Sequence, residues 1–129
     1  METKLIVIGS NSYSDYMELK SICTDFIKHL IIDGMSELGE VEILNGAFYD
    51  FGSLVMKYAK EHRLRIRGFL IGWVSMNFKW SNHTEEMFKY ATEGNHCDVI
   101  AFWDGKDTLT KEVLKLAEVY KVNTYINLI

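Results

Sequence analysis

The sequence predicts an α/β fold in which a five-stranded parallel sheet lies between two layers of helices. Strand-like and helix-like segments alternate five times along the 129 residues, with no proline, internal repeat or evident linker. Alternation with short connections is typical of a parallel sheet that is covered by helices on both faces. We therefore expect a single domain over residues 1–129, with right-handed crossovers between its strands.

Apolar runs mark the five strands, and their composition predicts the order of the strands in the sheet. The predicted strands cover residues 4–9, 41–44, 65–72, 97–103 and 123–129. The first and fourth are continuous apolar runs, which is typical of central strands buried on both faces, whereas the third and fifth alternate, as edge strands can. This difference favours the strand order 3-2-1-4-5.

Helical spacing of apolar residues predicts a helix after each of the first two strands. Asp15, with Glu18 three residues later, is typical of a helix start, and Gly34 ends the first helical pattern. The second helix is predicted over residues 53–62. The residues expected on the buried faces of these two helices are Leu19, Ile22, Cys23, Phe26, Leu30, Val55, Tyr58 and Ala59.

The third helix follows a long irregular segment, and the fourth follows a short loop. The irregular segment covers residues 73–85, and Asn82 with Glu85 three residues later indicates the start of a helix that Gly94 ends. The apolar faces predicted for the third and fourth helices consist of Met87, Tyr90 and Ala91, and of Leu109, Val113, Leu116, Ala117 and Tyr120.

Composition and charge exclude several classes of function. The chain is 48% hydrophobic and 25% charged, which is ordinary for a globular domain. With 14 basic and 18 acidic residues its net charge is −4, so its field repels a phosphate backbone and we expect no nucleic-acid partner. The apolar run before Gly9 is short, and no later run is long enough for a bilayer, so we expect a protein that is neither secreted nor membrane-spanning.

The cysteines and histidines show no pattern of a metal centre or a disulfide framework. Cys23 and Cys97 lie in a predicted helix and a predicted strand without CxxC spacing, which favours a reduced, cytoplasmic protein. The four histidines are scattered at positions 29, 62, 83 and 96. We therefore predict neither a metal site nor a cofactor.

The predicted strand order places two polar loops at one point of the sheet. The order reverses direction between the first and fourth strands, and ligands of open α/β sheets bind beyond the carboxyl ends of the strands at such a switch point. Backbone amides near a helix start favour an anion, and a lysine can neutralise phosphate charge. These residues can also be simple turns and caps, with Asp107 or Thr108 capping the last helix. The loop residues are Gly9, Ser10, Asn11, Asp104, Gly105, Lys106 and Thr110.

Two further segments are candidate walls of a ligand site. In residues 45–53, Gly46 and Ala47 permit close approach of a ligand to the backbone, and Asp50 can act as a base, hold a ribose hydroxyl, or only cap the helix. In residues 72–87, aromatic side chains can stack on a base, pack against a second subunit or cover the sheet edge. These aromatic residues are Trp73, Phe78 and Trp80.

Four segments of the chain carry a family resemblance: VIGSNSYSDY (7–16), LNGAFYDFGSLVMKYAKEHRL (44–64), SNHTEEMFKYA (81–91) and CDVIAFWDGKDTLTKEVLKLA (97–117). Together they resemble the SLOG superfamily of Rossmann-like domains, specifically its YspA-like branch. The resemblance covers nearly the whole chain and implies a three-layer, Rossmann-like domain that binds a nucleotide or a nucleotide derivative. For this branch, which occurs in bacterial and phage genomes, it also implies ligands that include signalling nucleotides of bacterial immunity, and in some members cleavage of an N-glycosidic bond.

The chain departs from the pattern of that family at positions that would carry charge. Asn11 stands where the family usually has an arginine, Ser81 stands in place of the arginine before the third helix, and Gly52 falls at the expected acidic position. Binding through neutral hydrogen bonds is therefore favoured over catalysis. The ligand residues that we predict are Gly9, Ser10, Asn11, Gly46, Ala47, Asp50, Trp73, Ser81, Asn82, Asp104, Gly105, Lys106 and Thr110.

The sequence thus favours a protein that holds a small nucleotide-like ligand, and one specific version is a phage-type protein that sequesters a host defence signal. The first alternative is an N-glycosidase-like hydrolase with Asp50 or Asp104 as acid or base. The second is an interaction module with a vestigial pocket, in which residues 73–80 form an interface. A homodimer or a higher homo-oligomer is expected.

Overall fold

The computed structural model, which describes residues 2–34, 37–46, 49–69 and 80–129, contains a five-stranded parallel sheet. The strand order is β3-β2-β1-β4-β5, so the predicted α/β fold and the predicted order are confirmed. The strands are β1 (Thr3–Gly9), β2 (Val41–Asn45), β3 (Arg65–Gly68), β4 (His96–Trp103) and β5 (Asn123–Leu128).

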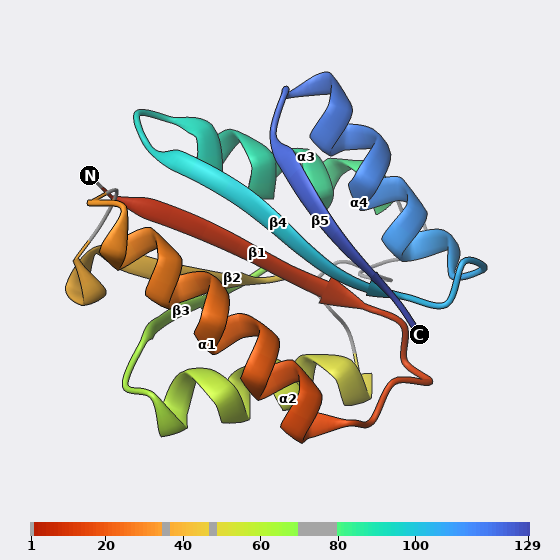
Figure 1. Ribbon diagram of the computed structural model, residues 1–129. Coiled ribbons are helices and arrows are strands. Elements are labelled where there is room, and N and C mark those ends of the chain that lie inside the picture. Colours follow the sequence, from red (N-terminus) through yellow and green to blue (C-terminus); the bar gives the residue numbers. More distant parts are fainter. Residues whose placement is uncertain (1, 35–36, 47–48, 70–79) are drawn as a thin grey trace.

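Helices cover both faces of the sheet and produce three layers (Figure 1). Helices α1 and α2 lie on one face, and α3 and α4 lie on the other. The helices are α1 (Tyr16–Ile32), α2 (Tyr49–Glu61), α3 (Trp80–Thr92) and α4 (Thr108–Val119), with a short 3-10 helix η1 (Leu38–Glu40) before β2.

Burial follows the strand composition that predicted the order. Every residue of β1 is buried, whereas every residue of β3 is exposed. The inner faces of α1, α2 and α4 carry the residues expected there, with Leu19, Val55 and Val113 fully buried. The central strands therefore lie in the core, and the polar loops that follow them lie at the carboxyl edge of the sheet.

Two predicted helix starts were wrong. Helix α2 begins at Tyr49 rather than at residue 53, because its first turn buries Phe51 in the core. Helix α3 begins at Trp80, so Asn82 lies inside it rather than at its start, and no glycine or proline in residues 80–92 interrupts the helix. Strand β3 ends at Gly68; residues 70–72 of the predicted strand lie outside the described residues.

Candidate functional site

Ser10 joins the two loops that meet at the switch point between β1 and β4. Its backbone amide donates to the Phe102 carbonyl (2.9 Å), and its Oγ accepts a hydrogen bond from the Asp104 amide (3.2 Å). The side chain is buried, with 1% of its surface exposed. Ser10 therefore fixes the positions of both loops relative to each other. Its buried hydroxyl, predicted as a ligand contact, binds the Asp104 amide instead of facing solvent.

The loop after β4 is organised by two aspartates. Oδ1 of Asp104 accepts hydrogen bonds from the amides of Lys106 and Asp107, both at 2.8 Å. These two amides hold the pKa of the Asp104 carboxyl below its usual range. Asp104 is therefore ionised near neutral pH, and it is poorly suited to donate a proton as a general acid.

Asp107 caps α4, which was one of the two readings that the sequence allowed. Its Oδ2 accepts hydrogen bonds from the amide (3.0 Å) and the hydroxyl (2.5 Å) of Thr110. Thr110 is fully buried. The hydroxyl of this predicted ligand residue thus holds the helix start in place and does not face solvent.

Both helix starts at the switch point already carry carboxylates of the protein itself. Asp15 caps α1 by accepting a hydrogen bond from the Glu18 amide (3.1 Å), and Glu18 lies in the first turn. Asp104 and Asp107 take the corresponding place at α4. Because a carboxylate at a helix start neutralises the positive end of the macrodipole, these two ends attract an added anion less than bare ends would.

Beneath the loops lies an aromatic cluster that sequence reasoning missed. Its rings belong to Tyr13, Phe51 and Phe102, whose centroids are 5.0 Å (Tyr13–Phe102), 5.8 Å (Phe51–Phe102) and 6.1 Å (Tyr13–Phe51) apart. A Cβ at Gly9 would lie only 2.4 Å from Cε1 of Phe51. Gly9 is thus needed for this aromatic packing. The three aromatic residues come from separate segments of the chain, so no local sequence pattern indicated the cluster.

The exposed polar groups of the site lie on the rim above this cluster. Asn11, Gly105 and Lys106 are exposed. Gly105 has φ +81°, a conformation that favours glycine, and it allows the chain to turn between Asp104 and Lys106. The rim therefore offers one amide side chain and one ammonium group beside the Asp104 carboxylate.

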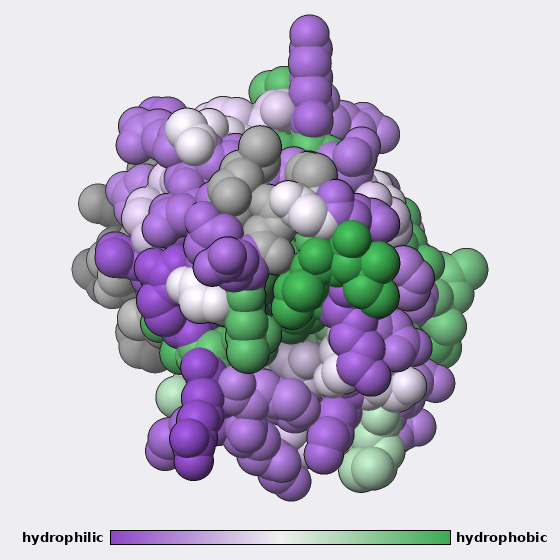
Figure 2. Space-filling view, turned by 60° about the vertical axis from the view of Figure 1, so that its left-hand side comes forward, coloured by the Kyte–Doolittle hydropathy of each residue, from purple (hydrophilic) through white to green (hydrophobic). Residues whose placement is uncertain are grey.

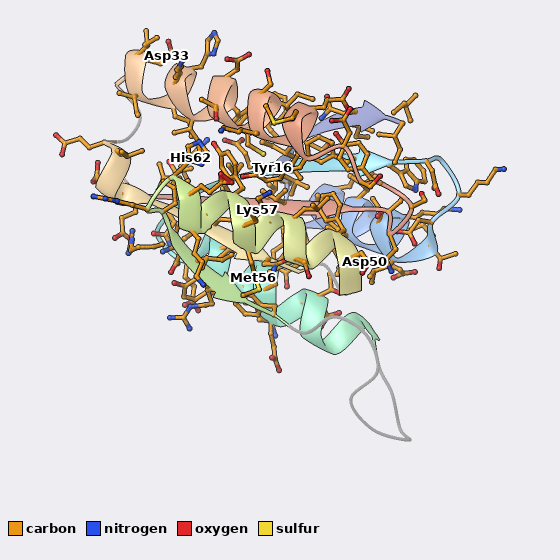
Figure 3. All side chains as sticks on the ribbon, turned by 90° about the horizontal axis from the view of Figure 1, so that it is seen from below. Tyr16, Asp33, Asp50, Met56, Lys57 and His62 are labelled. Carbon is orange, nitrogen blue, oxygen red and sulfur yellow. The ribbon has the colours of Figure 1, made fainter. Side chains whose placement is uncertain are left out.

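The loop after β2 ends near the same edge of the sheet. The side-chain Nδ2 of Asn45 donates to the Gly52 carbonyl (3.2 Å) and thereby connects the end of β2 to the first turn of α2. Gly46 is buried. Asp50 is exposed at the end of α2 that lies at the carboxyl edge (Figure 3).

The remaining predicted site residues are only partly described. Ala47 and Trp73 lie outside the described residues, as do residues 73–79 of the aromatic segment. The backbone of Ser81 and Asn82 lies in the first turn of α3. Among the predicted site residues, the structure thus brings together those after β1 and β4.

A surface hollow of about 420 Å³ lies along α2 and was not predicted. It is lined by Ser53, Met56, Lys57, Lys60 and Glu61. Next to it, the Lys57 ammonium lies 4.3 Å from the centre of the Tyr16 ring, and the Tyr16 hydroxyl donates to Glu61 (2.6 Å). These contacts join α1 to α2, and Figure 3 shows Tyr16 and Lys57 between the two helices.

Within the described ranges, no group of three or more histidine, cysteine or acidic side chains is arranged to hold a metal ion. Burial raises the pKa of both cysteine thiols to about 12, so neither Cys23 nor Cys97 is a reactive thiolate at neutral pH. None of the described helices combines the length and the apolar character that crossing a membrane requires.

No family model, no curated protein and no solved structure matches the chain.

Proposed function

We propose that the protein binds a small nucleotide or nucleotide-derived ligand at the carboxyl edge of the sheet, and that it holds this ligand without transforming it. The observation that carries the proposal is the junction at Ser10, which connects the loops after β1 and β4 at the switch point of the sheet. Asn11 and Lys106 stand exposed on the rim of these loops. They can donate hydrogen bonds to a ligand that lies across the loops.

The charge around the site favours a ligand with few phosphate groups. Asp15, Glu18, Asp104 and Asp107 bring four carboxylates to the two helix starts, whereas Lys106 supplies one ammonium group in the loop after β4. Carboxylates accept hydrogen bonds from sugar hydroxyls but repel a polyphosphate. We therefore propose a nucleoside-like ligand, or a derivative of low charge, rather than a triphosphate.

The protonation state of Asp104 favours binding over hydrolysis. Cleavage of an N-glycosidic bond needs a group that can give a proton to the leaving base. The amides of Lys106 and Asp107 stabilise the ionised form of Asp104. A carboxylate held in this form can orient a ligand hydroxyl, which is the role that we assign to it.

The test is ligand detection followed by a thermal-shift panel. Purified protein is denatured and the released small molecules are identified by mass spectrometry. The protein is then heated with nucleosides and with their mono-, di- and triphosphates. A ligand at one hundred times its Kd stabilises the folded state by about 2.7 kcal/mol, which corresponds to a Tm increase of roughly 10 °C for a domain of this size.

Variants of the rim locate the site. Lys106→Ala and Asn11→Ala should each reduce the thermal shift. Lys111→Ala, which changes an exposed lysine on α4 outside the rim, is the matched control and should leave the shift unchanged. A larger shift with a triphosphate than with the nucleoside would contradict the proposed low charge. The absence of a released nucleotide together with the absence of any thermal shift across the panel would refute the binding function.

A further inference from the structure

Strand β5 is an edge strand with exposed apolar side chains on both of its faces. Tyr125 is 45% exposed, Ile126 47% and Leu128 76%. In Figure 1, β5 lies at one margin of the sheet with β4 on its inner side, and among the described residues no strand pairs with its outer side. The face seen in Figure 2 is largely hydrophilic, with a group of hydrophobic residues near its centre.

The hydrogen-bonding groups on the outer side of β5 can be assigned from the ladder to β4. The Ile129 amide donates to the Trp103 carbonyl (3.0 Å), so residue 129 directs its backbone groups toward β4. Because the direction alternates along a strand, Thr124, Ile126 and Leu128 direct theirs away from β4. This outer row is an open template for another strand.

The strand lacks the features that prevent edge-to-edge pairing. Edge strands are commonly protected by a charged side chain, a proline or a bulge. Residues 123–129 contain no charged residue and no proline, and the pairing of β5 with β4 runs without interruption from Asn123 to Leu128. Two copies of this strand can therefore approach without bringing like charges together, although each chain has a net charge of −4.

We propose that β5 pairs with β5 of a second copy of this chain, antiparallel about a two-fold axis at Ile126. The two sheets of five strands then form one continuous sheet of ten. In this register, Ile126 faces the same residue of the second copy, and Thr124 faces Leu128. The apolar contact surface comes from the exposed side chains of β5, with Tyr125 on one face of the joined strands and Ile126 and Leu128 on the other.

Charge complementarity favours the antiparallel orientation. Lys121 precedes β5 and is exposed. At the other end of the strand, Leu128 pairs with Trp103, after which the chain enters the acidic loop, residues 104–107, in which Asp104 and Asp107 outnumber Lys106. In an antiparallel pair, Lys121 of each copy approaches the acidic loop of the other copy. A parallel arrangement would place the two acidic loops beside each other.

The experiment is measurement of the molar mass in solution by sedimentation equilibrium at submillimolar concentration. The unsubstituted chain should be a dimer. Ile126→Lys should be a monomer, because two lysines would face each other at the axis. Ile31→Lys on α1, where the side chain is 40% exposed, is the matched control and should remain a dimer. A monomeric unsubstituted chain, or a control that dissociates equally, would overturn the proposal.

Two further variants define the geometry of the pair. Ile126→Lys and Ile126→Glu should each be monomeric alone and should form a dimer when mixed, because opposite charges then meet at the axis. Ile126→Pro removes an outward amide without removing a hydrogen bond to β4, so it should give a folded monomer by circular dichroism. A mixture that stays monomeric, or a proline variant that stays dimeric, would refute pairing through Ile126. None of these outcomes depends on a nucleotide ligand.

Discussion

The two edge strands occupy equivalent positions in the sheet but differ in their chemistry. Strand β3 carries Arg65, which lies 3.6 Å from Glu2, and Arg67, whose guanidinium lies 4.5 Å from the centre of the Tyr90 ring. The corresponding residues 123–129 at the other edge carry no charge. Charged side chains discourage strand pairing. The comparison indicates that one edge of this sheet is protected and that the other is available.

The two sides of the sheet also differ in the core. We call β2 with β3 the β3 flank and β4 with β5 the β5 flank, and among the described residues each flank contains one buried carboxylate. Glu42 on β2 accepts hydrogen bonds from Lys4 (2.8 Å) and from the Tyr90 hydroxyl. Asp98 on β4 lies 2.7 Å from Nε2 of His96, and its Oδ1 has no partner among the described residues. Oε1 of Glu42 thus has two hydrogen-bond donors, one of which is an ammonium group. Asp98 has one contact, at Oδ2.

These environments shift the two pKa values in opposite directions. Burial alone would raise the pKa of Glu42, but the hydrogen bonds from Lys4 and Tyr90 outweigh burial and lower it. At Asp98 burial outweighs the attraction of His96, and the pKa is raised. The β3 flank therefore holds its buried charge favourably, whereas the β5 flank holds it at a cost.

The largest effect is expected from breaking the paired charge. Lys4→Met leaves Glu42 buried without its ammonium partner, and both side chains are nearly inaccessible (4% and 9% exposed). The free energy of unfolding should fall by about 3–5 kcal/mol. Urea denaturation measures it. Lys4→Met combined with Glu42→Leu is the control and should recover most of the loss, and a single variant as stable as the unsubstituted chain would contradict this account.

A change at the centre of the sheet, between the two flanks, should have the next largest effect. Gly9→Ala places a methyl group against the Phe51 ring, which is fully buried, and should cost about 1–3 kcal/mol through overpacking. Gly39→Ala is the matched control, because no described atom lies within 4 Å of the added Cβ. Urea denaturation of the two variants should separate them, and equal stabilities would show that Phe51 can move aside.

The order of the strands could be predicted because strands that are buried on both faces have continuously apolar sequences. Residues 5–8 and 99–103 are apolar without interruption, and they became the central strands. The cap at Asp107 was also visible, since a capping residue precedes its helix in the sequence. Apolar runs and helix caps involve residues that are close in the chain, so the sequence alone can show them.

The contacts that define the site join residues far apart in the chain, so no local pattern shows them. Ser10 and Asp104 are 94 positions apart. The packing of Phe51 over Gly9 likewise depends on where α2 crosses the sheet. Thr110 was predicted as a ligand residue because the sequence shows that it carries a hydroxyl group. The sequence does not show that this residue is buried and that its hydroxyl donates to Asp107.

A smaller effect should distinguish the two buried carboxylates by pH. Because the folded-state pKa of Asp98 is raised, the native state binds more protons than the unfolded chain above about pH 3.8, and this group lowers stability as pH rises. Asp98→Asn removes this dependence. Its free energy of unfolding relative to the unsubstituted chain should therefore increase with pH, by at most about 1.4 kcal/mol per pH unit. A relative stability that falls between pH 4 and 7 would show the opposite sign.

The smallest effect on stability, and the sharpest test of the comparison, comes from the arginines of β3. Arg65 and Glu2 are about half exposed (46% and 49%), so Arg65→Thr should change the free energy of unfolding by less than about 1 kcal/mol. Arg65→Thr combined with Arg67→Thr removes both charges from the edge. If charge is what separates the two edges, sedimentation should detect assemblies larger than a dimer, since each copy then offers two open strands. If the double variant keeps the mass of the unsubstituted chain, the protection of β3 has a source other than its arginines.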